Sequence, residues 1–166
     1  MAAVPGRAIR IGVIGSGRPH PKWDAWAAEV GRGIAEAHAI LVCGGLSGVM
    51  AAASKAAREA GGEVIGILPG TRVEEANPDV TLPIPTGLGE GRNLLVVQMS
   101  DALVAIGGGA GTLSEIGFAL KLHKPLVLLG SWRCEPPAGA DPLEPAPCQA
   151  LSPEEALRLA LQLGVK

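Results

Sequence analysis

The sequence predicts an α/β protein built on a single doubly wound, Rossmann-like parallel sheet with helices on both faces. Short apolar runs alternate with segments whose apolar residues recur every three or four positions, and these are the periods of buried strands and amphipathic helices. Several of the apolar runs also end in a glycine-rich turn that opens the following helix, as strand–helix connections in parallel sheets do.

The first half of the chain has the pattern of three strands separated by two helices. The expected elements are, in order, a strand at 9–14, a helix at 23–38, a strand at 40–43, a helix at 51–60 and a strand at 63–68. The first helix has one apolar face, to which Trp23 and Trp26 contribute, and we expect both indoles to pack in the core. Gly61 and Gly62 form a suitable stop for the second helix.

The second half continues the pattern after a proline-rich interruption. The expected elements are a crossover loop over the site at 71–89 with a short edge segment at 80–84, a helix at 90–99, a strand at 102–106, a helix ending near 122, a strand at 125–130, an irregular segment at 131–150, a short strand near 148–151 and a helix at 152–163. Ser152 and Pro153 suit the start of the last helix. With right-handed crossovers, the five main strands, numbered in chain order, are expected in the order 3-2-1-4-5.

Length and composition limit the classes of protein that fit. A chain of 166 residues suits one domain, spanning 1–166. The net charge of −2 argues against a general nucleic-acid partner, and no apolar run reaches the ~20 residues of a membrane span. The three cysteines form no CxxC pair, so we expect no metal site and no disulfide framework, and a cytoplasmic location.

Three glycine-bearing loops leave the first, second and fourth main strands, and together they predict an anion site. Ligands in open parallel sheets bind beyond the carboxyl ends of the strands, where helix N-termini and glycine amides favour a phosphate. We expect the phosphate-binding residues to be Gly15, Ser16, Gly17, Gly44, Gly45, Gly48, Arg92, Gly108, Gly109, Gly111, Thr112 and Glu115. Two alternatives stay open: the glycines permit tight strand–helix packing, and Arg92 with Glu115 forms a salt bridge between helix N-termini.

These residues also carry a resemblance to a known family. The runs Gly44-Gly45-Leu-Ser-Gly48-Val-Met50 and Gly108-Gly109-Ala-Gly111-Thr112-Leu-Ser-Glu115, with Arg92 nine residues before Asp101, resemble the superfamily of LONELY GUY-type (LOG) phosphoribohydrolases, also labelled possible lysine decarboxylases. The run from Arg92 to Gly109 is similar to the molybdenum-cofactor carrier branch. The resemblance covers most of the chain and implies a Rossmann-like fold and a homo-oligomer. No lysine sits in a recognisable pyridoxal phosphate setting, so a lysine decarboxylase is not expected.

Two functions follow from the residues and the resemblance. The first is a binding or carrier protein for a phosphorylated, nucleotide-like ligand such as the molybdenum cofactor. The second is a hydrolase that cleaves the N-glycosidic bond of a nucleoside 5′-monophosphate, with Arg92 and Glu115 as catalytic residues. Gly107 replaces the proline of the family pattern, and Gly89-Glu90-Gly91 replaces its Met-His-Glu. These departures favour the carrier.

Two further features concern the rim of the site and the surface. His20 and Trp132 border the glycine loops. Each has two possible roles: His20 either contacts the ligand or belongs to a solvated loop, and Trp132 either contacts the ligand or caps the core. We expect self-association through apolar helix surface that includes Leu94, Leu95, Val97 and Leu120.

Overall fold

The computed structural model describes residues 6–165, which form one seven-stranded sheet with helices on both faces. The strands are β1 (Arg10–Gly15), β2 (Ile40–Cys43), β3 (Val64–Leu68), β4 (Leu82–Pro85), β5 (Ala102–Ile106), β6 (Leu126–Leu129) and β7 (Cys148–Ala150). The helices are α1 (Pro21–Glu36), α2 (Val49–Glu59), α3 (Asn93–Met99), α4 (Ala110–Lys121) and α5 (Pro153–Gly164), with 3-10 turns η1 (Val73–Glu75) and η2 (Gly89–Arg92). Every neighbouring pair of strands is parallel.

The strand order β4-β3-β2-β1-β5-β6-β7 confirms the expected fold class. The five main strands are arranged as predicted, with β1 and β5 side by side at the point where the strand order reverses. The two short segments expected near 80–84 and 148–151 are the edge strands β4 and β7. Both are short, and β4 carries Pro83 and Pro85, which a sheet edge tolerates because a proline cannot donate a ladder hydrogen bond.

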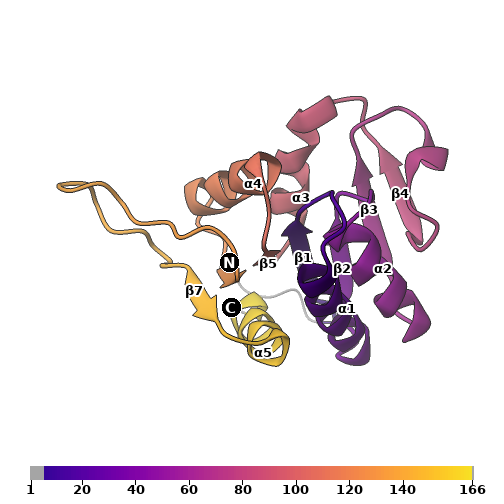
Figure 1. Cartoon of the computed structure of the whole chain (residues 1–166), viewed down its shortest axis with the longest axis horizontal. Helices are drawn as coiled ribbons and strands as arrows, with labels where there is room; N and C mark the ends of the chain where they lie inside the picture. The colour runs from indigo at the N-terminus through magenta and orange to yellow at the C-terminus, as the bar shows by residue number, and fades with distance from the viewer. Residues whose placement is uncertain (1–5, 166) are drawn as a thin grey trace.

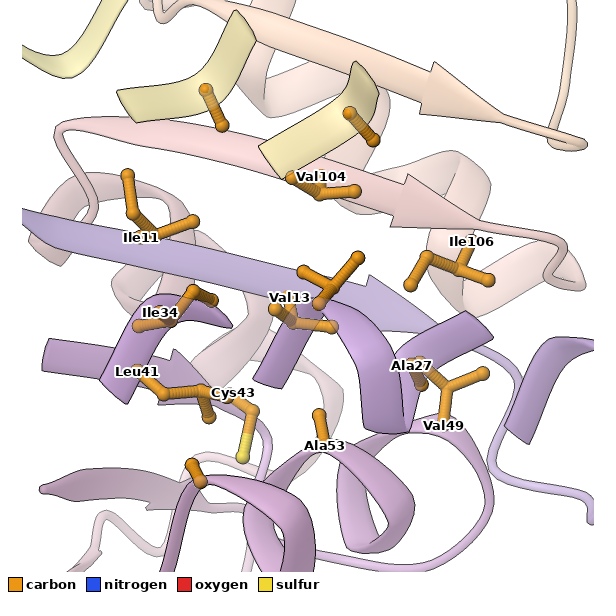
Figure 2. Close-up of a cluster of buried hydrophobic side chains, with 14 of the residues drawn as sticks. Ile11, Val13, Ala27, Ile34, Leu41, Cys43, Val49, Ala53, Val104 and Ile106 are labelled. Carbon is orange, nitrogen blue, oxygen red and sulfur yellow. The ribbon is translucent and has the colours of Figure 1, made fainter. Parts of the chain in front are cut away.

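Alternating side chains of the central strands fill two cores, one on each face of the sheet. Helices α1, α2 and α5 cover one face and α3 and α4 the other (Figure 1). Figure 2 shows the first core, in which Ile11, Val13, Val104 and Ile106 of the sheet face Ala27, Ile34, Val49 and Ala53 of α1 and α2. Leu103 and Ala105 point to the opposite core, against Ile116 of α4. Because both faces are covered, the central strands are apolar throughout, as a buried parallel sheet requires.

The two irregular segments, 71–89 and 131–147, differ in how they contact the sheet. The residues between β3 and η2 pair with the sheet edge through β4 and do not cover the site, so the expected crossover loop over the site is wrong: none of residues 71–89 lines the cavity described below. Residues 131–147 join β6 to β7: the segment begins against the turn after β5, where Ser131 donates to the carbonyl oxygen of Gly107, and its middle part extends well away from the sheet (Figure 1). No helix within residues 6–165 has the length and apolar character needed to cross a membrane.

The contact between α1 and α2 depends on Gly31, and this gives a first prediction. A Cβ at Gly31 would collide with the carbonyl oxygen of Ala53 in α2. We expect Gly31→Ala to lower the free energy of unfolding by about 1–3 kcal/mol, the usual cost of overpacking. Gly117→Ala in α4 is the matched control, since its Cβ meets nothing within 4 Å and should gain up to about 1 kcal/mol of helix propensity. Urea unfolding measures both, and equal shifts for the two variants would contradict this account.

Candidate functional site

A cavity of about 190 Å³ lies at the carboxyl ends of β1 and β2. Its wall comes from five places in the chain: the end of β1 with the following loop, the loop after β2, the start of α2, the junction of η2 with α3, and the first two turns of α4. The lining residues are Val13, Ile14, Gly15, Gly17, Gly44, Leu46, Met50, Glu90, Arg92, Asn93, Gly111, Thr112 and Glu115. This is the edge where parallel sheets bind ligands.

The first two glycine loops pack directly against each other. The backbone N–H of Val49 donates to the carbonyl oxygen of Ser16 over 3.0 Å. Gly48 has a φ of 64°, and a Cβ there would collide with that same carbonyl oxygen. A glycine is therefore required at position 48 both by backbone conformation and by space. The close approach fixes the rim of the cavity between β1 and β2.

The third glycine loop makes a turn that a proline could not form. Gly107 has a φ of 54°, and a Cβ at this position would collide with the indole of Trp23. Proline is restricted to a φ near −65°, so the backbone of this turn does not accommodate the proline of the family pattern. The turn leads to Gly109, the N-cap of α4. Gly111 and the buried Thr112 of the first helical turn then reach the cavity, where free backbone amides and the helix dipole favour an anion.

Arg92 is a buried cation on the cavity wall. It is 6% exposed, its Nη1 donates to Oδ1 of Asn93 over 2.6 Å, and its Nε is buried without a hydrogen-bond partner in the described part of the chain. Gly44 leaves room for it, because a Cβ at that position would lie 2.6 Å from Nη1. Asn93 is held in turn through Ser114, whose hydroxyl accepts from Asn93 Nδ2 over 3.1 Å. The guanidinium is thus positioned by neighbours yet retains unused donor capacity.

Glu115 lies beside Arg92 but does not neutralise it near pH 7. Burial raises the pKa of Glu115 to about 8, the nearby Arg92 lowers it and Glu90 raises it. The closest approach, from Arg92 Nη1 to Glu115 Oε1, is 3.8 Å, which satisfies an ion-pair distance but exceeds that of a hydrogen bond. Both side chains are almost fully buried, so desolvation outweighs the attraction across this gap. At neutral pH the carboxyl is predominantly protonated, and within residues 6–165 no other carboxylate lies within 4 Å of the Arg92 guanidinium.

The structure brings together only part of the residue set expected to bind phosphate. The members that line the cavity are Gly15, Gly17, Gly44, Arg92, Gly111, Thr112 and Glu115. The members that do not line it are Ser16, Gly45, Gly48, Gly108 and Gly109. Most of these shape the loops: Gly45 packs close to Leu68, and a Cβ at Gly108 would collide with Thr112. Ser16 accepts a hydrogen bond from the N–H of Arg18 within its own loop.

Several lining residues were missed by the sequence analysis. They are Val13, Ile14, Leu46, Met50, Glu90 and Asn93. Asn93 directly follows Arg92 and begins α3, so its position next to the arginine was a usable signal. The apolar members carried no signal, because an apolar side chain that borders a cavity has the same sequence pattern as one that only fills the core.

His20, Trp132 and Asp101 lie outside this cavity. His20 is the N-cap of α1, where its Nδ1 accepts from the N–H of Trp23 over 3.4 Å, and its ring stacks on that indole. Trp132 donates its indole N–H to the carbonyl oxygen of Gly109 over 3.2 Å. Asp101 lies at the opposite end of the sheet, where it accepts hydrogen bonds from Arg7 and Arg10. Burial there raises the pKa of Asp101, but these hydrogen bonds outweigh it and hold the pKa below its ordinary value.

Comparisons with known proteins agree with this geometry. The molybdenum cofactor carrier protein of Chlamydomonas reinhardtii is 38% identical, with a TM-score of 0.83 over 96% of this chain and 100% of that one. The molybdenum cofactor binding protein of Rippkaea orientalis is 34% identical, with a TM-score of 0.83 over 95% and 98% of the two chains. A cytokinin riboside 5′-monophosphate phosphoribohydrolase of Mycobacterium tuberculosis is 36% identical over 115 residues, 64% of this chain and 62% of that protein. The chain therefore spans less than two thirds of that hydrolase.

A family model gives the same assignment from the sequence. The model described as the SLOG cluster4 family matches residues 8–157, well over half of the chain. The structural neighbours and the phosphoribohydrolase relative both support the ligand-binding role of LOG-like proteins. On these grounds the chain belongs to the SLOG cluster4 family.

Proposed function

We propose that this protein binds, and serves as a carrier for, a phosphorylated nucleotide-like molecule, with the phosphate held in the Arg92 cavity. The observation that carries the proposal is the buried guanidinium of Arg92, whose Nε has no hydrogen-bond partner among residues 6–165 and which faces a carboxyl that is protonated near pH 7. A buried charge without a counter-ion is costly. An anionic ligand removes that cost and accepts charge-assisted hydrogen bonds from the same group.

The molybdenum cofactor is the first ligand that we propose. The two solved structures named above, which carry this cofactor's name in their descriptions, are covered over 98% and 100% of their length by this chain. The backbone amides at the start of α4 and the hydroxyl of Thr112 would share the phosphate with Arg92. We also propose that the protein acts in the cytoplasm as a homodimer or larger homo-oligomer. Among the residues expected at its interface, the choice of Val97 is wrong, because this side chain is buried in the core. Leu94, Leu95 and Leu120 are partly exposed and Leu113 of α4 is exposed, so the proposed interface is the apolar surface of α3 and α4.

Hydrolysis of a nucleoside 5′-monophosphate is the second candidate function. It is favoured by one feature of the cavity: Glu115, with a pKa of about 8, holds a proton at neutral pH and is suited to protonate a leaving base as a general acid. In that case Arg92 would bind the phosphate of the substrate. The shorter match to the phosphoribohydrolase ranks this function below the carrier.

Native mass spectrometry of the protein as purified from its expression host tests the proposal. We expect an oligomer that retains a phosphorylated small molecule, whose mass and fragments identify it. A parallel incubation with adenosine and guanosine monophosphates, followed by chromatography of free base, should detect no release. Release of base by the parent that is abolished in Glu115→Gln would favour the hydrolase, and failure of both nucleotides and ribose 5-phosphate to bind would overturn both functions.

A further inference from the structure

A second hollow lies next to the turn that borders the Arg92 cavity, on the side of the turn nearest β6. It has a volume of about 190 Å³ and is lined by Trp23, Gly107, Gly108, Gly130, Ser131 and Trp132. Its floor is the backbone of Gly107 and Gly130, which have positive φ values of 54° and 58°. A Cβ at Gly107 would collide with Trp23, and a Cβ at Gly130 would collide with Trp26. The walls are the indoles of Trp23 and Trp132. The hollow therefore combines a glycine floor with aromatic sides.

Both indoles are held in place by their neighbours. Trp23 stacks on the imidazole of His20, with ring centroids 4.1 Å apart. Trp132 is fixed at its N–H by the carbonyl oxygen of Gly109, yet the residue remains 42% exposed. An indole that is hydrogen-bonded on its edge but exposed elsewhere presents a preorganised apolar surface, and such surfaces favour stacking with a planar ring.

The turn 107–112 links this hollow to the Arg92 cavity. Gly107 and Gly108 line the hollow, whereas Gly111 and Thr112 line the cavity. Each volume alone is below the roughly 300 Å³ at which ligand pockets usually begin. A ligand that crosses the turn uses both spaces, with its anionic end beside Arg92 and its remaining part against Trp132.

We propose that Trp132 and the glycine floor beside it form the binding site for a planar fused-ring heterocycle, covalently attached to the phosphate that the Arg92 cavity holds. This inference rests on the proposed function for the position of the phosphate. It adds the place in the fold, and the residues, that would hold the other end of the ligand. The glycine floor lets the ring approach the backbone closely, and the Ser131 hydroxyl, which donates to the carbonyl oxygen of Gly107, retains lone pairs that accept a hydrogen bond from a ring N–H.

Three probes separate the two ends of the ligand: adenosine 5′-monophosphate has both, ribose 5-phosphate lacks the ring and adenosine lacks the phosphate. Calorimetric titration of the full chain should show tighter binding of adenosine 5′-monophosphate than of either fragment. Trp132→Ala should weaken the binding of adenosine 5′-monophosphate roughly five- to 150-fold, the range for one base stacked on an aromatic side chain. It should leave the affinity for ribose 5-phosphate unchanged, which also shows that the turn remains intact.

Two further variants complete the test. Trp132→Phe keeps a stacking surface and should retain most of the affinity. Trp26→Phe, whose ring does not line the hollow, should bind all probes as the parent does. The chain has three tryptophans and no tyrosine, so quenching of indole fluorescence by the nucleotide should persist in Trp26→Phe and decrease in Trp132→Phe.

The outcomes distinguish this inference from the proposed function. Equal affinity of the parent and Trp132→Ala for the nucleotide would overturn the ring site, as would an equal loss for the nucleotide and ribose 5-phosphate. Binding of adenosine that depends on Trp132, without any binding of ribose 5-phosphate, would support the ring site and contradict the phosphate site. Absence of binding and quenching with all three probes would overturn both.

Discussion

Replacing Arg92 with methionine is expected to weaken the binding of ribose 5-phosphate by about 1.5–3 kcal/mol, which corresponds to roughly tenfold to 150-fold. Methionine keeps the length and much of the volume of the side chain but removes the charge and all donors. The loss is large because the guanidinium is 6% exposed, so that water does not replace the lost hydrogen bonds. Isothermal titration calorimetry at pH 7 measures the change.

Arg18→Met is the matched control for this prediction. Arg18 is exposed on the loop after β1 and does not line the cavity, so loss of its charge should change the affinity by less than threefold at 150 mM salt, because exposed charges are screened there. Equal effects of the two substitutions would indicate that only the general charge of this edge attracts the anion. Unchanged binding in Arg92→Met would remove the arginine from both proposed functions.

Glu115→Gln is expected to abolish a specific pH dependence of ligand binding. Between pH 7 and 9 ribose 5-phosphate stays a dianion, because its second pKa is near 6. Glu115 ionises in this interval with a pKa of about 8, and the new negative charge repels the ligand. Affinity in the parent should therefore fall as pH rises through 8, whereas the variant should keep its neutral-pH affinity. The other groups that act on Glu115 are Arg92, which lowers its pKa, and Glu90, which raises it. Burial raises the pKa of the nearby Cys43 thiol.

Glu115→Gln is also expected to change how the free energy of unfolding depends on pH. The folded-state pKa of Glu115 is raised above its ordinary value of 4.5, so the folded protein holds a proton that the unfolded chain releases. The contribution of Glu115 to the free energy of unfolding therefore decreases as pH rises from about 4.5 to about 8 and is constant above pH 8. The total decrease is up to about 5 kcal/mol. Glutamine does not ionise, so Glu115→Gln does not show this decrease. Urea unfolding at pH 5 and pH 9 should show the variant gaining relative to the parent at pH 9 only, and a constant difference would contradict the raised pKa.

The order of the strands and the location of a site at their carboxyl edge could be predicted because both follow from local patterns. Apolar runs such as 102–106, followed by glycine turns and helical periodicity, identify buried strands and crossover helices, and handedness restricts how they assemble. The loop residues could be predicted less well. Gly45 and Gly48 have the same sequence signal as Gly44, but only Gly44 lines the cavity.

Asp101 shows that the family's Arg–Asp spacing does not place the two side chains together in space. It follows Arg92 by nine residues, as in the family, yet α3 lies between them, and Asp101 is bonded to Arg7 and Arg10 at the opposite end of the sheet. The path of 71–89 was likewise not determined locally. Its prolines indicate an irregular segment, but the pairing of β4 with β3 is a contact between residues distant in the chain.

Residue type and short-range order are enough to predict the doubly wound parallel sheet and the glycine loops at its carboxyl edge, whereas the choice of Arg92 and Glu115 as functional residues came from the family resemblance and stays a prediction. The charge state of these two residues and the shape of the space around them depend on the tertiary structure. Burial of Glu115 raises its pKa, and the positive φ of Gly107 against Trp23 forms the turn between two hollows. Both depend on desolvation and close packing by elements distant in sequence, which no local pattern encodes.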